Sequence, residues 1–176
     1  MLKKIERAQQ LLKKEAAVFR CPTCHEPMHV EGVGLICQQR HQFDLSKKGT
    51  LYFLKHGVQT EYNKKMFTSR GKMIQSGMYA PVLNKIIHYL PQNKTVVDVG
   101  CGEGSFLAEL SQAGLSGLKI GFDLSKEGIY LASNQPIDAF WCVADLTNLP
   151  FANEGLDTIL NIFSPSHYQE IGRAHV

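Results

Sequence analysis

Residues 96–106 read VVDVGCGEGSF, a β-branched apolar run followed by a turn with three alternating glycines. The amphipathic segment 106–110 comes next, so the pattern predicts a strand, a tight turn and a helix. Glycines let the backbone approach a ligand closely, and the first turn of a helix directs free N–H groups toward it. Taken alone, such a turn indicates a nucleotide-like ligand without specifying which one.

Two acidic residues make the turn more specific. The apolar stretch 118–122 ends in Asp123, about twenty residues after the glycines, where Rossmann-like folds place the acid that binds ribose hydroxyls. Asp98 precedes Gly100 by two residues. The resulting Asp-x-Gly-x-Gly-x-Gly form resembles motif I of class I S-adenosylmethionine-dependent methyltransferases more closely than the dehydrogenase fingerprint.

Further apolar runs extend the pattern of strands. Residues 140–145 and 157–163 each read as a strand, and helical stretches alternate with the strands along the chain. This alternation predicts a doubly wound parallel sheet, an α/β fold of the Rossmann-like class. In such sheets the ligand lies beyond the carboxyl ends of the strands, where the glycine turn, Asp123, Asp145 and Asn161 would converge. An acid at the position of Asp145 faces the adenine amino group in methyltransferase-like folds.

The cysteine pattern near the N-terminus predicts a metal site. Cys21 and Cys24 are separated by two residues, Cys37 and His41 by three, and twelve residues separate the two pairs. Each pair places two ligands on one metal face and two pairs complete a tetrahedron, so we expect a structural zinc ion. The run Cys21-x-x-Cys24-His25 also matches the c-type haem attachment pattern, but haem attachment requires export and would leave Cys37 and His41 unexplained.

Composition restricts the class of protein. The chain has 176 residues, 44% of them apolar, and a formal charge of +3. A packed core is therefore expected, while the total charge gives no strong polyanion-binding signature. The sequence has no run of eighteen apolar residues and no secretory leader pattern, so we expect a cytoplasmic protein with no membrane partner and five reduced cysteines.

The remaining segments are interpreted as docking or connecting elements. Residues 1–18 read as a short basic helix with an apolar stripe, either a docking helix or an RNA-contacting arm. Residues 55–72 are polar and cationic with one acid, Glu61, and are interpreted as a linker or an RNA contact. Residues 72–90 are predicted to be helical, with interruptions at Gly77 and Pro81.

The chain resembles the bacterial 23S ribosomal RNA guanine-N1 methyltransferases in four motifs: CPxCH at 21–25, CxxRHxFD at 37–44, DxGCGEG at 98–104 and IFSP at 162–165. The resemblance covers residues 17–169 and implies a zinc module ahead of a class I methyltransferase domain. It implies S-adenosylmethionine as cofactor, with contacts at Gly102, Glu103 and Tyr79, zinc at the four ligands named above, and 23S rRNA as partner.

The resemblance also sets the expected divisions of the chain. Family members continue beyond the strand predicted at 157–163, so we expect an incomplete methyltransferase domain. The final six residues read IGRAHV, which resembles the translation of a common sequencing adapter, and we expect a non-native tail. The divisions are an N-terminal helix at 1–18, a zinc-binding module at 19–56, a linker with a helix at 57–80, the methyltransferase domain at 81–170 and the tail at 171–176.

The predicted activity is methyl transfer to guanine N1 in a hairpin of 23S rRNA. Guanine N1 carries a proton at neutral pH, so a base or hydrogen-bond partner must assist, and the sequence assigns no residue to that role. The expected cofactor contacts are Tyr79, Asp98, Gly100, Gly102, Glu103, Gly104, Asp123, Asp145, Leu146 and Asn161. We expect that removal of residues 1–56 would abolish RNA methylation and leave cofactor binding largely intact.

Two alternative functions and the oligomeric state stay open. The chain could be a methyltransferase for another RNA or a small molecule, because motif I does not encode the acceptor. It could also be an inactive, zinc-bearing RNA-binding fragment. A homodimer is left open as well.

Overall fold

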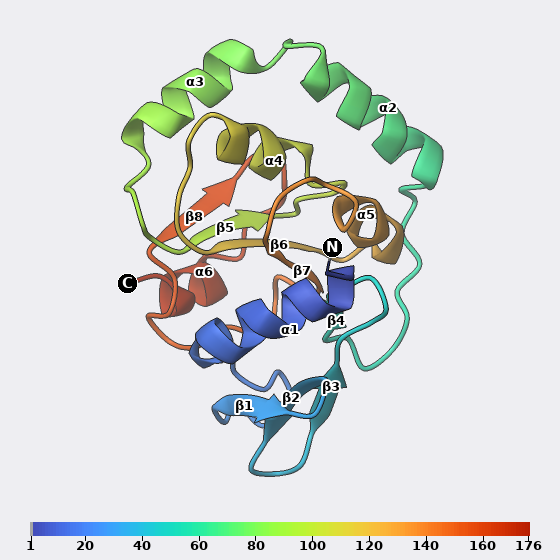
Figure 1. The fold of residues 1–176 in the computed structure, drawn as a ribbon, viewed down its shortest axis with the longest axis vertical. Coiled ribbons are helices and arrows are strands. Elements are labelled where there is room, and N and C mark those ends of the chain that lie inside the picture. The colour runs from blue at the N-terminus through green and yellow to red at the C-terminus, as the bar shows by residue number, and fades with distance from the viewer. Residues whose placement is uncertain (1) are drawn as a thin grey trace.

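The computed structural model describes residues 2–176, and Met1, the first residue of the expected N-terminal helix, lies outside the described residues. Two sheets form within this range (Figure 1). The small antiparallel sheet has the order β1-β2-β3, with bounds Met28–Glu31, Gly34–Cys37 and Gln42–Asp44. The parallel sheet has the order β4-β7-β6-β5-β8, with bounds Thr50–Tyr52, Phe140–Val143, Lys119–Asp123, Val96–Val99 and Thr158–Asn161.

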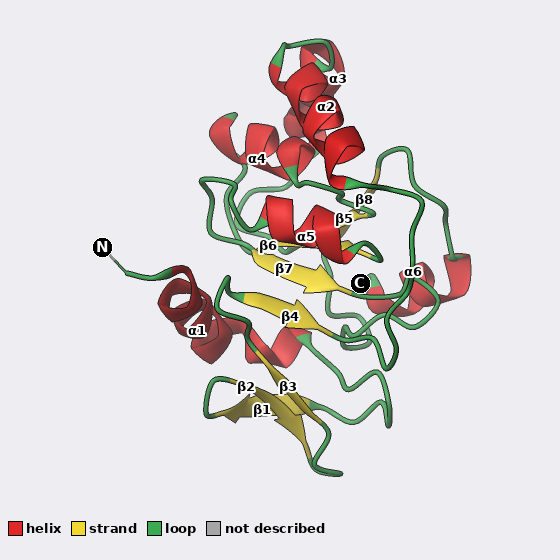
Figure 2. Cartoon of the chain, turned by 90° about the vertical axis from the view of Figure 1, so that its right-hand side faces the viewer, coloured by secondary structure: helices red, strands yellow, loops and turns green. Residues whose placement is uncertain are grey.

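Helices and the small sheet surround the parallel sheet. Figure 2 shows α2, α3, α4 and α5 gathered on one side of the strands and the small sheet next to β4. The helices are α1 Lys4–Glu15, the 3-10 helix η1 Ala16–Val18, α2 Lys64–Gln75, α3 Ala80–Tyr89, α4 Ser105–Gln112, α5 Lys126–Ala132 and α6 Tyr168–Ala174. The expected α/β class, a doubly wound parallel sheet preceded by a small cysteine-rich module, is confirmed.

Successive residues of the buried strands face two different cores, as the two-residue period of a strand requires. In β5, Val97 packs in a cluster that also contains Leu12 of α1 and Leu35 of the small sheet. Val96, its neighbour, packs in the other cluster with Phe106 of α4. Both faces of the parallel sheet are therefore covered, which explains why its strands read as continuous apolar runs.

The edge strand β4 is the main difference from the sequence prediction. Residues 50–52 fall within the range 19–56 that the sequence analysis assigned to the zinc module. Leu51 is buried in the cluster that contains the zinc-module residues, but β4 pairs in parallel with β7, with Thr50 opposite Trp141 and Tyr52 opposite Val143. The last strand within the range of the zinc module is thus an edge strand of the parallel sheet.

Phe19 fixes the zinc module to the parallel sheet at a second point. Its ring centroid lies 5.0 Å from that of Phe140 in β7 and 5.9 Å from that of Phe151. The backbone pairs here as well, because Arg20 N–H donates to the carbonyl of Pro150 at 3.1 Å. Removal of residues 1–56 would strip this buried face of the sheet, so the structure does not support the expectation that cofactor binding would survive that deletion.

Helix α2 begins inside the segment interpreted as a linker. Asn63 caps it, since its side chain accepts a hydrogen bond from Met66 N–H at 3.0 Å. Phe67 and Ile74, seven residues apart, are buried on one side of the helix. Residues 64–75 of this segment are therefore helical, which is compatible with the expected division of a linker with a helix at 57–80. The predicted helical region 72–90 is interrupted at residues 76–79, between α2 and α3.

The C-terminal residues form α6 and pack on the loop before β8. Ala174 is buried, and Leu156 N–H donates to its carbonyl at 2.9 Å. This packing does not test whether residues 171–176 are native, which stays a prediction. No helix in residues 2–176 is both long enough and apolar enough to cross a bilayer.

Candidate cofactor pocket and metal centre

The turn after β5 requires glycine at three positions. Gly100, Gly102 and Gly104 all have positive φ, at 65°, 56° and 78°, a region that side chains with a Cβ rarely adopt. A Cβ atom at Gly100 would lie 2.6 Å from Cβ of Ser164, and one at Gly102 would lie 2.6 Å from a guanidinium nitrogen of Arg70. Backbone conformation and close packing therefore both select glycine here.

A cavity of about 530 Å³ lies beyond this turn, at the carboxyl ends of the strands. Five of the expected cofactor contacts line it: Gly100, Gly102, Asp123, Asp145 and Leu146. The remaining lining residues were not assigned from the sequence, and they include aliphatic, aromatic, hydroxyl-bearing and cationic side chains. They are Thr60, Tyr62, Met66, Phe67, Arg70, Val99, Phe122, Leu124, Ala144, Thr147, Phe163, Ser164, Pro165, Ser166 and His167. This position is where open parallel sheets bind their ligands.

The other five expected contacts lie around the cavity without lining it. Asp98 and Glu103 are buried, and Gly104 is the N-cap of α4. Tyr79 packs its ring against Phe106, at 5.3 Å between centroids, and against Phe163, at 5.8 Å. The fifth residue, the amide of Asn161, donates to the hydroxyl of Ser166 at 2.6 Å and to the carbonyl of Pro165 at 3.2 Å.

Asp123 holds the glycine turn in place. One carboxylate oxygen accepts a hydrogen bond from Gly102 N–H at 2.9 Å, and the other accepts one from Ser125 N–H at 2.7 Å. Burial raises the pKa of Asp123, while these two hydrogen bonds lower it. Because each carboxylate oxygen has two acceptor positions, the side chain retains acceptor capacity toward a ligand hydroxyl.

Three carboxylates surround one guanidinium next to the turn. Arg70 donates to Oε2 of Glu103 at 2.6 Å and to the carbonyl of Cys101 at 3.3 Å. Burial raises the pKa of Asp98 to about 7, the nearby Arg70 opposes this shift, and Asp123 and Glu103 add to it. Among the described residues, Oδ2 of Asp98 and Oε1 of Glu103 are buried oxygens without a hydrogen-bond partner.

These unpartnered acceptors suit a cationic ligand. Buried polar oxygens are normally hydrogen-bonded, so each unsatisfied one requires an explanation such as a ligand donor. S-adenosylmethionine carries a sulfonium and an ammonium group against a single carboxylate. The residues present therefore fit this cofactor, with carboxylates and glycines at the turn and Asp123 and Asp145 beyond it.

Arg70 and Phe163 are two of the lining residues that sequence reasoning did not assign. Arg70 falls in the segment interpreted as a linker, where one cation among several gives no distinguishing signal. Phe163 ends an apolar run and reads as the last residue of a strand. Its positive φ of 61° is set by the loop after β8 and has no counterpart in the residue pattern.

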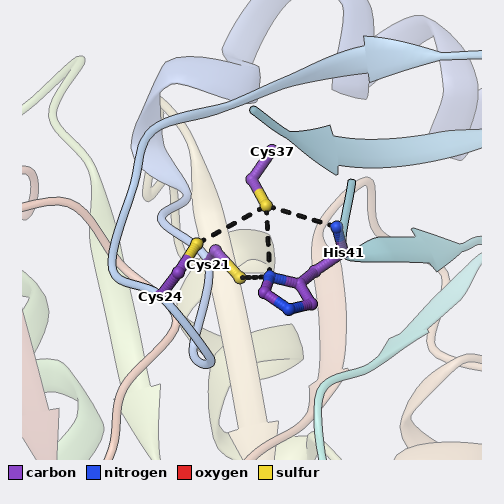
Figure 3. A group of neighbouring side chains, drawn as sticks. All are labelled: Cys21, Cys24, Cys37 and His41. Carbon is purple, nitrogen blue, oxygen red and sulfur yellow. Dashed lines mark hydrogen bonds between the residues drawn. The ribbon is translucent and has the colours of Figure 1, made fainter. Parts of the chain in front are cut away.

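The predicted metal ligands come together in the small module. The ligand atoms of Cys21, Cys24, Cys37 and His41 all lie within 4.8 Å of one another (Figure 3). Sγ of Cys24 lies 3.5 Å from Sγ of Cys37, and Nδ1 of His41 lies 3.4 Å from the latter and 3.5 Å from Sγ of Cys21. Zinc–sulfur bonds of about 2.3 Å give a tetrahedral edge of about 3.8 Å, so the cluster has the size of a zinc site.

Backbone N–H groups donate hydrogen bonds to two of the sulfur atoms in the cluster. Cys37 Sγ accepts a hydrogen bond from His41 N–H at 3.3 Å, and Cys21 Sγ accepts one from Thr23 N–H at 3.4 Å. Burial raises the pKa of Cys24 to about 11. At Cys37 burial acts in the same direction, but hydrogen bonds, led by that of His41 N–H, outweigh it and lower the pKa to about 7. Four protein ligands leave no open position, as in structural zinc sites.

Comparison with known proteins agrees with both parts of this description. A family model described as "Methyltransferase domain" matches residues 96–175, and one described as "RlmA, N-terminal" matches residues 19–55. Among solved structures, a SAM-dependent methyltransferase from Aquifex aeolicus has a TM-score of 0.50 and 17% identity, covering 65% of this chain and 68% of that chain. A TehB-like SAM-dependent methyltransferase from Corynebacterium glutamicum has a TM-score of 0.50 and 22% identity, covering 64% and 68%. These likenesses show the fold.

The matches to curated relatives cover both the zinc ribbon and the methyltransferase domain. YxjB of Bacillus subtilis, which carries the provisional name 23S rRNA (guanine-N(1)-)-methyltransferase, is 40% identical over 89% of this chain. The 23S rRNA (guanine(748)-N(1))-methyltransferase of Streptomyces fradiae is 27% identical over 92% of it. The chain spans 60% of the length of each of these relatives. The curated homologues of this chain are thus 23S rRNA (guanine-N1)-methyltransferases, and the chain resembles them in both its zinc ribbon and its methyltransferase domain.

Proposed function

We propose that this protein uses S-adenosylmethionine to methylate guanine N1 in 23S rRNA. The observation that carries the proposal is the cavity at the strand ends, which Gly100 and Gly102 of the glycine turn line together with the carboxylates of Asp123 and Asp145. The zinc ribbon attached to the same sheet, and the names of the relatives, support rRNA as the acceptor.

Within this proposal the cofactor contacts are the ten residues expected from sequence, and Arg70 joins them. Asp123 would hold the ribose hydroxyls, while Asp145 and Leu146 would lie at the adenine. Bound S-adenosylmethionine supplies an electrophilic methyl group. The protein contributes placement, and holding both reactants in line is worth roughly 7–11 kcal/mol in favourable cases.

Helix α2 supports an RNA contact beside the cavity. It carries Lys64, Lys65, Arg70 and Lys72 and contains no acidic residue. Met66 and Phe67 of the same helix line the cavity, so the cationic helix lies at its wall. Lysines that neutralise phosphates make binding strongly dependent on salt. We therefore expect the RNA affinity of this chain to fall steeply as the salt concentration rises.

The proposal also includes the divisions of the chain, its location and its self-association. We retain the bounds 1–18, 19–56, 57–80, 81–170 and 171–176, with the qualification that β4 at 50–52 serves the parallel sheet. The proposed location is the cytoplasm, because the rRNA substrate is found there. Fractionation of cells tests this location. Light scattering over a range of protein concentrations tests for a homodimer.

Two measurements test the proposed function. Calorimetry should detect S-adenosylmethionine binding at one site per chain, which separates an enzyme from an inactive RNA-binding fragment. Incubation with 23S rRNA from a strain that lacks the modification should then create a primer-extension stop, because an N1-methyl group blocks Watson–Crick pairing. Cofactor binding without any stop on rRNA would refute the rRNA proposal and favour another RNA or a small molecule as acceptor.

A further inference from the structure

The loop after β8 presents an aromatic side chain to solvent in an unfavourable conformation. Phe163 is 79% exposed and has a φ of +61°. Positive φ is uncommon for residues other than glycine, and for a bulky residue it is an outlier that points to a functional constraint. Exposure adds a second unfavourable feature, because a large apolar ring remains in water. Two such features at one residue call for an explanation beyond packing.

Hydrogen bonds from neighbouring side chains fix this loop. The Asn161 amide donates to the hydroxyl of Ser166 and to the carbonyl of Pro165, so it spans the loop. The hydroxyl of Ser164 bonds to the Asn161 side chain and to the carbonyl of Val99 at 2.8 Å. The loop is thereby bonded to itself and to the end of β5, which fixes the backbone that carries the exposed ring.

The ring lies at the wall of the cofactor cavity, across the glycine turn from the acids that would hold the nucleoside. Phe163 lines the cavity together with Gly100 and Gly102. In the strand order β7-β6-β5-β8, Asp145 and Asp123 follow β7 and β6, whereas Phe163 follows β8, on the opposite side of β5. A nucleoside held by the two acids would leave this aromatic side of the cavity to the second reactant.

Neighbouring rings support Phe163 from within the protein. Its centroid lies 5.8 Å from that of Tyr79 and 6.4 Å from that of Phe106. A rigid, supported ring with an exposed surface suits a flat aromatic partner, and unstacked RNA bases bind to proteins by stacking on such side chains. A guanine that is methylated at N1 must leave its base pair, and enzymes that act on a base commonly hold the extruded base by stacking.

We propose that Phe163 is the stacking platform for the extruded purine base of the RNA substrate. This inference rests on the proposed function and adds to it the residue that positions the acceptor. Stacking does not require a particular base, so Phe163 would supply affinity and orientation, and other contacts would distinguish guanine.

The first test measures base binding without methyl transfer. Saturation-transfer NMR on the protein loaded with S-adenosylhomocysteine should show transfer to H8 of guanosine 5′-monophosphate used as the probe. Phe163→Leu, which keeps an apolar side chain but removes the ring, should lose this transfer, and Phe163→Tyr should recover most of it. The control is Tyr89→Leu, because Tyr89 is 70% exposed on α3 and does not line the cavity. Equal transfer in wild type and Phe163→Leu, or none in wild type, would overturn the inference.

The second test separates this inference from the proposed function. Calorimetry sets a saturating S-adenosylmethionine concentration for wild type and for Phe163→Leu, so that both are compared with the cofactor bound. In the primer-extension assay, kcat/KM for rRNA should fall about 5- to 150-fold in Phe163→Leu, the range that loss of one base–aromatic stack implies. If wild type leaves rRNA unmethylated, the proposed function fails while the NMR result still decides the role of Phe163. If wild type and Phe163→Leu methylate rRNA equally fast, the stacking role is refuted and the proposed function stands.

Discussion

The guanidinium of Arg70 in α2 donates to the carboxylate of Glu103 in the glycine turn at 2.6 Å. This ion pair joins a helix from the N-terminal half of the chain to the cofactor cavity. It leaves Oε1 of Glu103 and Oδ2 of Asp98 buried without partners among the described residues. The single positive charge of Arg70 thus does not neutralise both neighbouring carboxylates, and a cationic cofactor would supply further positive charge.

Arg70→Ala should destabilise the protein by about 3 kcal/mol, because it leaves the buried Glu103 carboxylate without its ion-pair partner. Thermal and urea unfolding of the cofactor-free protein measure this loss. Lys72→Ala provides the control on the same helix, where substitution of an exposed residue should change stability by at most about 0.5 kcal/mol. If the two variants unfold alike, the ion pair does not stabilise the fold.

Asp98→Asn should make the cofactor-free protein more stable above pH 7. The folded-state pKa of Asp98 is raised to about 7 from an ordinary value of 3.8, chiefly by burial. The wild type therefore loses stability as the pH rises from 4 through 7, by at most about 4 kcal/mol for this shift. The asparagine variant lacks this loss, so its advantage should be large at pH 8 and absent at pH 4. Unfolding curves at both pH values test it, and Asp44→Asn at an exposed position should show no such pH dependence.

Asp123→Ala should weaken S-adenosylmethionine binding. The ribose hydroxyls would lose a charged acceptor, and each such bond is worth roughly 1.5–3 kcal/mol, which is about 10- to 150-fold in Kd. The structure adds a second cause, since the variant also frees Gly102 N–H from its hydrogen bond. Calorimetry measures the affinity, and an unchanged value would remove Asp123 from the cofactor site.

Cys37→Ser should release the zinc ion and lower the stability of the whole chain. Structural metal binding is linked to folding, and Cys21 and Cys37 belong to the same buried cluster as Val97 and Phe140 of the parallel sheet. Metal analysis and hydrogen exchange in β4 and β7 would follow both effects. The control is His29→Ser, at an exposed position of β1 in the same module. Loss of zinc with unchanged protection of β7 would show that the module unfolds independently.

The residue pattern predicted local structure and the metal ligands well because both depend on short spacing. The glycines of the turn at 100–104 are close together in sequence, and so are the two members of each ligand pair, 21 with 24 and 37 with 41. The structure places both features as expected. The parallel sheet followed from the alternation of apolar strands and helices, since strands buried on both faces need crossover helices.

The missed features depend on contacts between distant parts of the chain. Thr50 pairs with Trp141, and Arg70 meets Glu103, across separations that no local periodicity records. Asn161 illustrates the same limit, because its position at the carboxyl end of a strand was expected while its hydrogen bonds to the loop after β8 were not. The start of helix α2 at Lys64 was missed because few of its residues are buried and most of its exposed side chains are polar.

Strand β4 also has a consequence for the order in which the chain acquires structure during synthesis. The partner of Thr50 is Trp141, and a ribosome that adds about 5–20 residues per second needs roughly 5 to 18 s for the intervening ninety or so residues. The metal-binding ribbon can bind its ion and fold within that interval. The backbone N–H and C=O groups of β4 stay unpaired until β7 has been synthesised. A nascent chain of this kind carries an open strand edge beside a finished ribbon, and such edges invite pairing with other chains.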